Sequence, residues 1–356
     1  MHAGTDLESV RDTVGTTAES LRAWLTRGAA QSADGAYVAW LDAATGAASY
    51  EYPEITGYAL TYLAQLPTLS PEERANGERA AGWLVERLDR GDLSARSGWD
   101  NGAVYVFDLA MVASGLLSFG SRIGAERLVD TGLRLVDLLE EHMDADGPLS
   151  PVSAHAPASA RSAWSTHGRA HLAKVVQALL VGEELGQVGS GSAAATLIEA
   201  VKRLQHDDGR FDTGPENVTM LHPHLYAAEG LWMWGVARGD ADATARARAA
   251  VEWVWGMQLP NGGFPRFEDG AAEDEQSDVT AQAVRLALML EPASPDVDRG
   301  VARLVELAQP HDEGRAMLYQ PHASRRHFNT WATMFAAQAL AVAASLAESV
   351  PWQAFV

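Results

Sequence analysis

The chain contains no cysteine among its 356 residues. Disulfide bonds, thiolate metal ligands and cysteine nucleophiles are therefore excluded. Basic residues are also few, because 27 Lys and Arg stand against 47 Asp and Glu, which gives a formal net charge of -20. A surface this acidic does not neutralise phosphates, so we expect neither nucleic acid nor an anionic membrane as a partner.

Long hydrophobic runs are missing as well. No stretch of about 18 apolar residues is free of breaks, so no membrane span is expected. Residues 1–22 mix charged and apolar side chains and lack the pattern of a secretory signal, so we expect a cytoplasmic location. The sequence also has no convincing serine nucleophile elbow, phosphate-binding glycine loop or dinucleotide fingerprint.

What the sequence does contain is a repeating pair of helices, rich in Ala and Leu. In each unit an amphipathic helix ends in a polar turn, usually with Gly, and a more apolar helix follows. The first helices are expected at 20–27, 73–88, 126–142, 195–205, 245–258 and 297–308. The second helices are expected at 53–66, 104–119, 166–185, 223–237, 278–290 and 329–346.

The two kinds of helix differ in their polarity, and this difference predicts the fold. The second helices are apolar nearly all round and must be buried on all sides, whereas the first helices keep one polar face. We therefore predict an all-α fold, an (α/α)6 toroid formed by residues 1–356 as one domain, with the second helices inside. An open solenoid is the alternative packing. Closure is favoured because the two ends look alike and neither has a polar cap.

Polar residues recur where the inner helices begin, and in a toroid these positions meet at one mouth. Buried polar groups are costly unless they are paired or used, so the recurrence predicts a site. The candidate catalytic residues are Glu54, Tyr58, Asp108, His222, His224, Glu229, Asp278 and His327. The candidate substrate-binding residues are Tyr52, Trp99, Trp164, His167, Tyr226, Trp232, Arg325, Arg326, Asn329 and Trp331.

Several of these residues also have a purely structural interpretation. Asp278 and Asn329 could cap helices, and Glu54 could complement the positive end of a helix. The tryptophans could belong to the core. Asp108 is different, because it lies between the apolar strings VYVF and LAMV and needs a partner if it is buried. Lys174 or Arg285 could be that partner.

The residue types favour acid–base chemistry by Glu, Asp, His and Tyr. His222, His224 and His327 with a carboxylate would suffice for a divalent metal, but His-Pro-His spacing alone is a weak signal. We therefore predict no metal and no cofactor.

Two groups of toroids resemble this chain. The segments AVEWVWGMQLPNGGF and DVTAQAVRLAL resemble the repeat signature of terpenoid cyclases and prenyltransferases. The chain departs from both, because it has no Asp-x-Asp-Asp string and no cysteine for zinc. The resemblance therefore implies their fold and leaves their reactions in doubt.

The second group comprises the six-hairpin carbohydrate enzymes: glycoside hydrolases, unsaturated-uronide hydrolases, uronic-acid epimerases and polysaccharide lyases. The segments YPEITGY, YVFD, HPHLYAAEGLW and NTWATMFAAQAL are similar to such proteins. This resemblance implies an enzyme that acts on a sugar, with carboxylates moving protons and tryptophans packing on the sugar ring. Arg325 or Arg326 would hold a carboxylate or phosphate of the substrate.

Two other functions stay open at this point. A cyclase-like enzyme for an isoprenoid requires an apolar, aromatic-lined cavity with a single acid at its top. A non-catalytic toroid that binds a partner at the mouth requires polar residues paired with one another and no deep pocket. The sequence does not indicate an oligomeric state.

Overall fold

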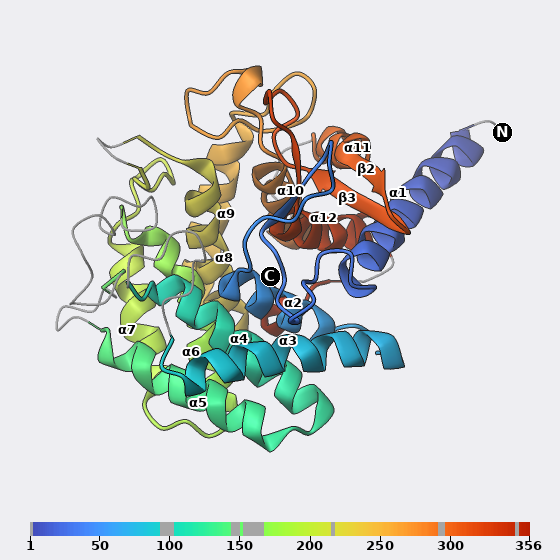
Figure 1. Ribbon diagram of the computed structural model, residues 1–356. Coiled ribbons are helices and arrows are strands. Elements are labelled where there is room, and N and C mark those ends of the chain that lie inside the picture. The colour runs from blue at the N-terminus through green and yellow to red at the C-terminus, as the bar shows by residue number, and fades with distance from the viewer. Residues whose placement is uncertain are drawn as a thin grey trace.

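A double ring of helices forms the protein (Figure 1). The computed structural model describes residues 3–92, 103–143, 150–151, 167–214, 218–290, 296–345 and 349–356. The outer helices are α1 (Ala3–Thr26), α3 (Pro71–Asp89), α5 (Glu126–Glu141), α7 (Ser190–Lys202), α9 (Ala241–Trp255) and α11 (Val297–Leu307). The inner helices are α2 (Pro53–Ala64), α4 (Val106–Ile123), α6 (Val176–Glu184), α8 (Leu221–Arg238), α10 (Ser277–Leu290) and α12 (Thr330–Ala343), and the 3-10 helix η3 (Ala170–Val175) leads into α6.

The inner ring is closed. Each inner helix contacts the next one along the chain, from α2 to α12, and α12 in turn contacts α2. Each inner helix also packs against its outer partner, with α1 covering α12. The prediction of an (α/α)6 toroid is therefore confirmed, and the open solenoid is wrong.

Glycines let some inner helices approach at backbone distance. A Cβ atom added to Gly115 of α4 would lie 2.3 Å from the carbonyl oxygen of Gly57 in α2. A Cβ atom on Gly230 of α8 would lie 2.2 Å from the carbonyl carbon of Ala173 in η3. Only a residue without a side chain fits at either contact, so the spacing of these helices depends on glycine.

A repeated turn joins outer helices to the segments that follow them. Gly35, Gly209 and Gly262 have φ values of 103°, 94° and 92°, which favour glycine. Four residues before each of them stands a glutamine: Gln31, Gln205 and Gln258. The amide of each glutamine donates to the carbonyl of its turn glycine and to a second carbonyl, of Asn76, Arg246 and Asp296 respectively. The motif therefore ties the turn to the neighbouring outer hairpin.

The protein also contains a small antiparallel sheet, which the sequence pattern did not predict. Its order is β1-β4-β3-β2, from β1 (Trp40–Asp42), β2 (Ala308–His311), β3 (Gly314–Leu318) and β4 (His327–Asn329). The strands have only three to five residues, too few to leave a clear alternating pattern. β4 leads directly into α12, so the sheet carries side chains to the beginning of the inner helices.

The opposite end of the ring is filled by the segment 352–356. Its 3-10 helix η6 (Trp352–Ala354) contacts α2, α6 and α8, and Phe355 and Val356 are fully buried. The Gln177 amide donates to three carbonyls of this segment at 2.9–3.1 Å, and the Gln338 amide donates to the Ala354 carbonyl at 2.7 Å. The candidate site lies at the other end, where the inner helices begin.

One helix of the described part, α4, is long and apolar enough to cross a membrane by length and composition. Its apolar window is 78% buried inside the protein, as expected for a core helix of a closed ring.

We predict that Gly115→Ala lowers the free energy of unfolding by about 1–3 kcal/mol or more, because the new methyl group overlaps the α2 backbone. Gly82→Ala is the matched control, since Gly82 is exposed on α3 with nothing within 4 Å of its added Cβ. The free energy of unfolding of Gly82→Ala should rise by about 0.5–1 kcal/mol. Equal urea midpoints for both variants would contradict the close helix contact.

Candidate functional site

The site is built from one register that recurs in four inner helices. The second, sixth and ninth residues of a helix share one face, because they are four and three apart. In α8 these residues are His222, Tyr226 and Glu229, and in α10 they are Asp278, Gln282 and Arg285. In α2 they are Glu54, Tyr58 and Thr61, and in α12 they are Trp331, Phe335 and Gln338. The faces form three layers, from the mouth toward the segment 352–356.

In the first layer, α8, α10 and α12 bring together an imidazole, a carboxylate and an indole. His222 Nδ1 lies 3.4 Å from Asp278 Oδ2 and 2.7 Å from Gln282 Oε1. The Trp331 indole donates to Asp278 Oδ2 at 3.1 Å. Burial lowers the pKa of His222, more than Asp278 raises it, so the ring is neutral near pH 7.

Aromatic rings border this layer, and several of them come from the sheet. His327 lies between Trp40 and Tyr319, with ring centroids 5.1 Å from each. Tyr319 packs at 5.5 Å on Trp331, and Tyr50 packs on both Trp40 and Tyr52. Burial lowers the pKa of His327 to about 4, so this ring is neutral as well. Trp40, Tyr50 and Tyr319 were not among the predicted site residues. Trp40 belongs to β1 and Tyr319 directly follows β3, and neither strand was predicted.

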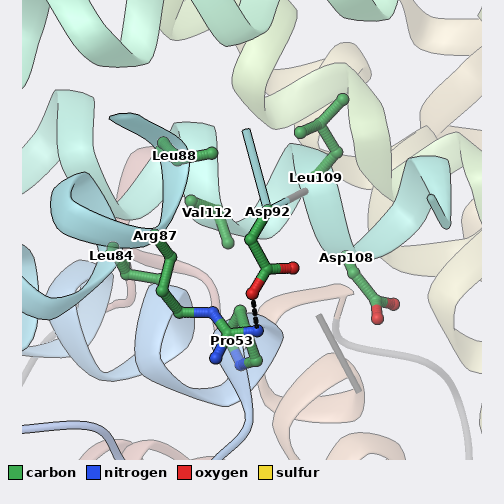
Figure 2. Close-up of a pocket in the computed structure, with 8 residues that line it drawn as sticks. All are labelled: Pro53, Leu84, Arg87, Leu88, Asp92, Asp108, Leu109 and Val112. Atoms are coloured by element: carbon green, nitrogen blue, oxygen red, sulfur yellow. Dashed lines mark ion pairs between the residues drawn. The ribbon is translucent and has the colours of Figure 1, made fainter. Parts of the chain in front are cut away.

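Asp108 and Glu54 are buried beside the mouth, at 3% and 5% exposure. Asp108 lines a small pocket between α2, α3 and α4, together with Pro53, Arg87 and Asp92. Figure 2 shows Arg87 and Asp92 pointing toward each other, as an ion pair at 2.5 Å, whereas the Asp108 carboxylate points away from them. Arg87 therefore has Asp92 as its counter-charge.

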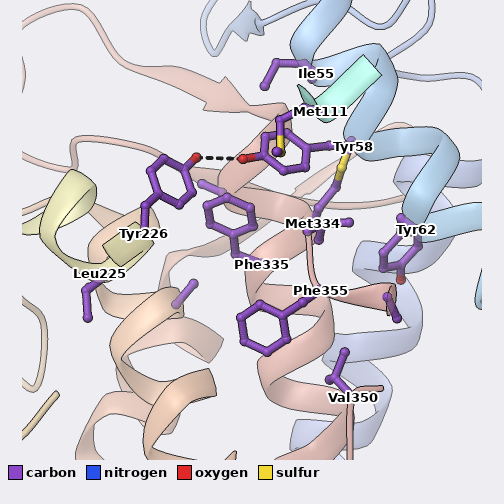
Figure 3. Packing of buried hydrophobic residues seen from close by; sticks show 14 of the residues in the cluster. Ile55, Tyr58, Tyr62, Met111, Leu225, Tyr226, Met334, Phe335, Val350 and Phe355 are labelled. Atoms are coloured by element: carbon purple, nitrogen blue, oxygen red, sulfur yellow. Dashed lines mark hydrogen bonds between the residues drawn. The ribbon is translucent and has the colours of Figure 1, made fainter. Parts of the chain in front are cut away.

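The second layer is a pair of buried phenols. The Tyr58 hydroxyl donates to the Tyr226 hydroxyl at 3.1 Å, and the Tyr226 ring lies 4.4 Å from the ring of His222. Figure 3 shows both rings at one end of an aromatic cluster that continues through Phe335 to Phe355. Burial raises the pKa of both phenols well above the usual value, so they stay protonated and act as hydrogen-bonding groups.

The third layer is an ion cluster with no exposed surface. Glu229 accepts from Lys174 Nζ at 2.5 Å, from Arg285 at 2.7 Å and from the Gln282 amide at 3.0 Å. Arg285 also lies 3.8 Å from the centroid of the Phe355 ring. Burial alone would raise the pKa of Glu229, but the two cations hold it below the usual value. Burial lowers the pKa of Lys174 to about 8.

This cluster corrects two predictions. Lys174 or Arg285 was a possible partner of Asp108, but both cations pair with Glu229. Glu229 was also expected to act as an acid or base. Glu229 lies in the third layer and is ionised between two cations. It therefore has no proton to donate and binds one only weakly, so its role is structural.

The prediction of His224 as a catalytic residue is wrong. Its Nδ1 accepts from the Phe211 amide at 3.2 Å and its Nε2 donates to the Ala250 carbonyl at 3.0 Å. It is the fourth residue of α8, and the fourth residues of α2, α10 and α12 are Thr56, Thr280 and Thr333. The hydroxyl of each threonine likewise accepts a hydrogen bond from a backbone amide. Aligning the repeats would have separated His224 from His222.

Three predicted binding residues also lie elsewhere or act as caps. Trp232 follows His222 by ten residues, about 15 Å along the helix, and packs on Phe355 at 4.7 Å. Asn329 caps α12, because its side chain accepts from the Ala332 amide at 2.9 Å. Arg325 is 83% exposed and pairs with Asp42 on β1.

The remaining predicted residues have simpler outcomes. Arg326 is exposed and His167 is partly buried in the segment before η3. Trp99 and Trp164 lie outside the described residues. Within the described ranges, no three His, Asp or Glu side chains are grouped closely enough to hold a metal ion.

Fold and mouth together define a six-hairpin toroid with acid–base groups and aromatic rings where its inner helices begin. No protein-family model and no curated protein sequence matches the chain. Solved structures do match. Unsaturated glucuronyl hydrolase from Bacillus sp. GL1 aligns over 95% of this chain and 96% of its own, with a TM-score of 0.68 and 14% identity.

Two further structures give the same result. Unsaturated glucuronyl hydrolase from Streptococcus agalactiae, as a mutant complexed with dGlcA-GalNAc6S, covers 93% of this chain and 91% of its own, with a TM-score of 0.69 and 11% identity. Cellobiose 2-epimerase from Bacillus thermoamylovorans covers 90% and 97%, with a TM-score of 0.68 and 12% identity. At such identities the likeness establishes the toroid fold alone.

We predict that Glu229→Gln destabilises the protein by about 3–5 kcal/mol, because it leaves two buried cations without their counter-charge. Glu313→Gln is the control, since Glu313 is 81% exposed in its pair with Arg27, and it should change stability by less than about 1 kcal/mol. Chemical unfolding measures both. The cluster would not have the role described if the two variants lost the same stability.

Proposed function

We propose that this protein is an enzyme that carries out acid–base chemistry on a sugar or a sugar-containing small molecule at the mouth of the toroid. The observation that carries the proposal is the first layer, where His222, Asp278 and Trp331 meet within hydrogen-bonding or close polar distance. Structures with this fold include hydrolases and an epimerase of sugars, which supports the same class of substrate.

The roles follow from the state of each group. A neutral imidazole such as His222 can accept a proton from a substrate hydroxyl or carbon. Asp278 orients it and stabilises the imidazolium that forms. Asp108 and Glu54 supply further carboxylates beside the mouth, and His327 is a second neutral imidazole. The rings of Trp40, Tyr319 and Trp331 offer apolar faces on which the carbon face of a sugar can pack.

The isoprenoid alternative is not favoured. It requires an apolar cavity along the axis, whereas the axis holds Lys174, Glu229 and Arg285 and is filled beyond them by Phe355. A non-catalytic toroid is the second candidate function. It is favoured by the mutual pairing of polar groups in the third layer and between His222 and Gln282.

The proposal is tested by incubating the protein with an unsaturated uronyl disaccharide, cellobiose, saturated uronic acids, sugar nucleotides and prenyl diphosphates. Loss of the substrate double bond reports hydrolysis, and a new epimer on chromatography reports epimerisation. Thermal unfolding reports binding without turnover, since a ligand at 100 times its Kd adds about 2.7 kcal/mol. Stabilisation by prenyl diphosphates alone, or by none of these compounds, would contradict the proposal.

On the sugar that is turned over, we predict that Asp108→Asn and Glu54→Gln each lower kcat. A group that transfers a proton contributes about 10²–10⁴-fold, and an amide cannot replace it. Glu183→Gln is the control and should keep full activity, because Glu183 is partly exposed at the end of α6, away from the mouth. If both mouth variants keep full turnover, the assignment of the catalytic carboxylates to this mouth is wrong.

We expect Trp40→Ala to act differently, by raising KM with little change in kcat. The ring packs on Tyr50 and His327 at the border of the site, so it contributes to binding and moves no proton. A lost aromatic contact of about 0.5–1.5 kcal/mol corresponds to roughly 2- to 13-fold in KM. Steady-state kinetics on the same sugar measure this, and a fall in kcat at constant KM is the result that would exclude a binding role.

A further inference from the structure

A chain of hydrogen bonds connects the buried ion cluster to the mouth. Gln282 stands between the two, one turn of α10 after Asp278 and one turn before Arg285. Its Nε2 lies 3.0 Å from Glu229 Oε1, and its Oε1 lies 2.7 Å from His222 Nδ1. Gln282 and Glu229 have no exposed surface, and His222 is partly buried, with 16% of its side chain exposed.

The direction of the hydrogen bonds is fixed by the charge of Glu229. Its carboxylate is held ionised by Lys174 and Arg285, so both oxygens can only accept. The Gln282 atom that faces it must therefore be the NH2 group, and the opposite orientation would oppose two acceptors at 3.0 Å. The carbonyl oxygen of Gln282 is then the atom that faces His222.

A carbonyl oxygen also only accepts, so His222 Nδ1 must carry the hydrogen in this contact. Asp278 Oδ2 at 3.4 Å is a second acceptor on the same side of the ring. Since the ring is neutral near pH 7, its second nitrogen, Nε2, carries no proton. The charge of Glu229, two hydrogen bonds away, thus determines which nitrogen of His222 can act as a base.

We propose that Gln282 is a positioning residue, which transmits the fixed orientation of the Lys174–Glu229–Arg285 cluster to His222 and holds its imidazole in the Nδ1–H tautomer. The catalytic meaning of this tautomer rests on the proposed function. The tautomer itself does not, because it follows from the two acceptors that face Nδ1 and from the neutral state of the ring.

The chain contains its own reference for the measurement. His224 lies two residues further along α8, and both of its partners are backbone groups of unambiguous direction. Its Nδ1 accepts from the Phe211 amide and its Nε2 donates to the Ala250 carbonyl, so it must be the Nε2–H tautomer. One helix therefore holds two neutral histidines with opposite tautomers.

The first experiment records nitrogen-15 spectra of the full chain labelled at its 11 histidines, without any ligand, at pH 7.5. Two-bond correlations distinguish protonated from unprotonated ring nitrogens, and His222→Gln and His224→Gln samples assign the signals. We expect Nδ1–H at His222 and Nε2–H at His224. Nε2–H at His222, or an equal mixture of the two forms, would overturn the proposal.

The second experiment asks whether Gln282 sets the tautomer. Gln282→Met keeps the length of the side chain and removes its carbonyl, so His222 should become a mixture of tautomers while His224 stays unchanged. Gln338→Met is the matched control. Gln338 is likewise a buried amide that bonds to the cluster, through Arg285, but its amide donates to the Ala354 carbonyl and not toward His222.

The two variants separate the possible outcomes. If Gln338→Met shifts His222 as much as Gln282→Met, the effect is a general loosening of the core and the proposal is wrong. If Gln282→Met leaves His222 fully Nδ1–H, Asp278 alone sets the tautomer and the proposal is also wrong. If Gln282→Met does not fold, the wild-type spectrum still decides the tautomer.

These results are distinguishable from those on the proposed function. A pure Nδ1–H tautomer at His222 in a protein that turns over no sugar would support this inference and contradict the enzyme proposal. Turnover of a sugar by a protein with Nε2–H at His222 would do the reverse.

Discussion

Glu229, buried between Lys174 and Arg285, is the constraint around which the inner ring is organised. Its two oxygens receive hydrogen bonds from η3 and α10, and the same cations contact aromatic rings of α2, α8 and α12 and of the segment 352–356. Charges without exposed surface are expensive to bury, and well-packed apolar residues often do as well or better for stability. The function of such a cluster is better sought in the geometry that it imposes.

That geometry extends to the mouth through the helix register. Once the ninth residue of α8 and of α10 points to the axis, the sixth and second residues must do so as well. Gln282 and Tyr226 thereby fall one turn above the cluster, and His222 and Asp278 fall one turn above them. The candidate catalytic groups are in this sense placed by the ions beneath them, and Gln282 makes the connection through hydrogen bonds.

The sequence was sufficient for the ring of helices, because each inner helix is apolar nearly all round and long enough to show it. It also placed Glu54, His222 and Asp278 correctly at the beginning of inner helices. It was not sufficient to tell His222 from His224, since a local pattern does not show which face of a helix looks inward. The fourth-position threonines of other repeats carry that information, as the structure makes clear.

Other errors have equally specific causes. Glu229 was expected to act as an acid or base. Its partners Lys174 and Arg285 come from other hairpins, 55 and 56 residues away in the chain, so the local sequence does not show that it is paired. Trp232 was expected at the mouth, although ten residues of helix separate it from His222. The strands that carry Trp40 and His327 are stabilised by pairing between the two ends of the described chain, which no local signal predicts.

The most direct test of this account replaces all three ions by apolar residues of similar size, in Lys174→Met, Glu229→Leu and Arg285→Met together, and then measures the tautomer of His222. We expect a folded toroid, because removing the whole cluster leaves no unpaired charge, in which His222 has become a mixture of tautomers. A folded triple variant whose His222 remains entirely Nδ1–H would show that the buried ions do not govern the mouth.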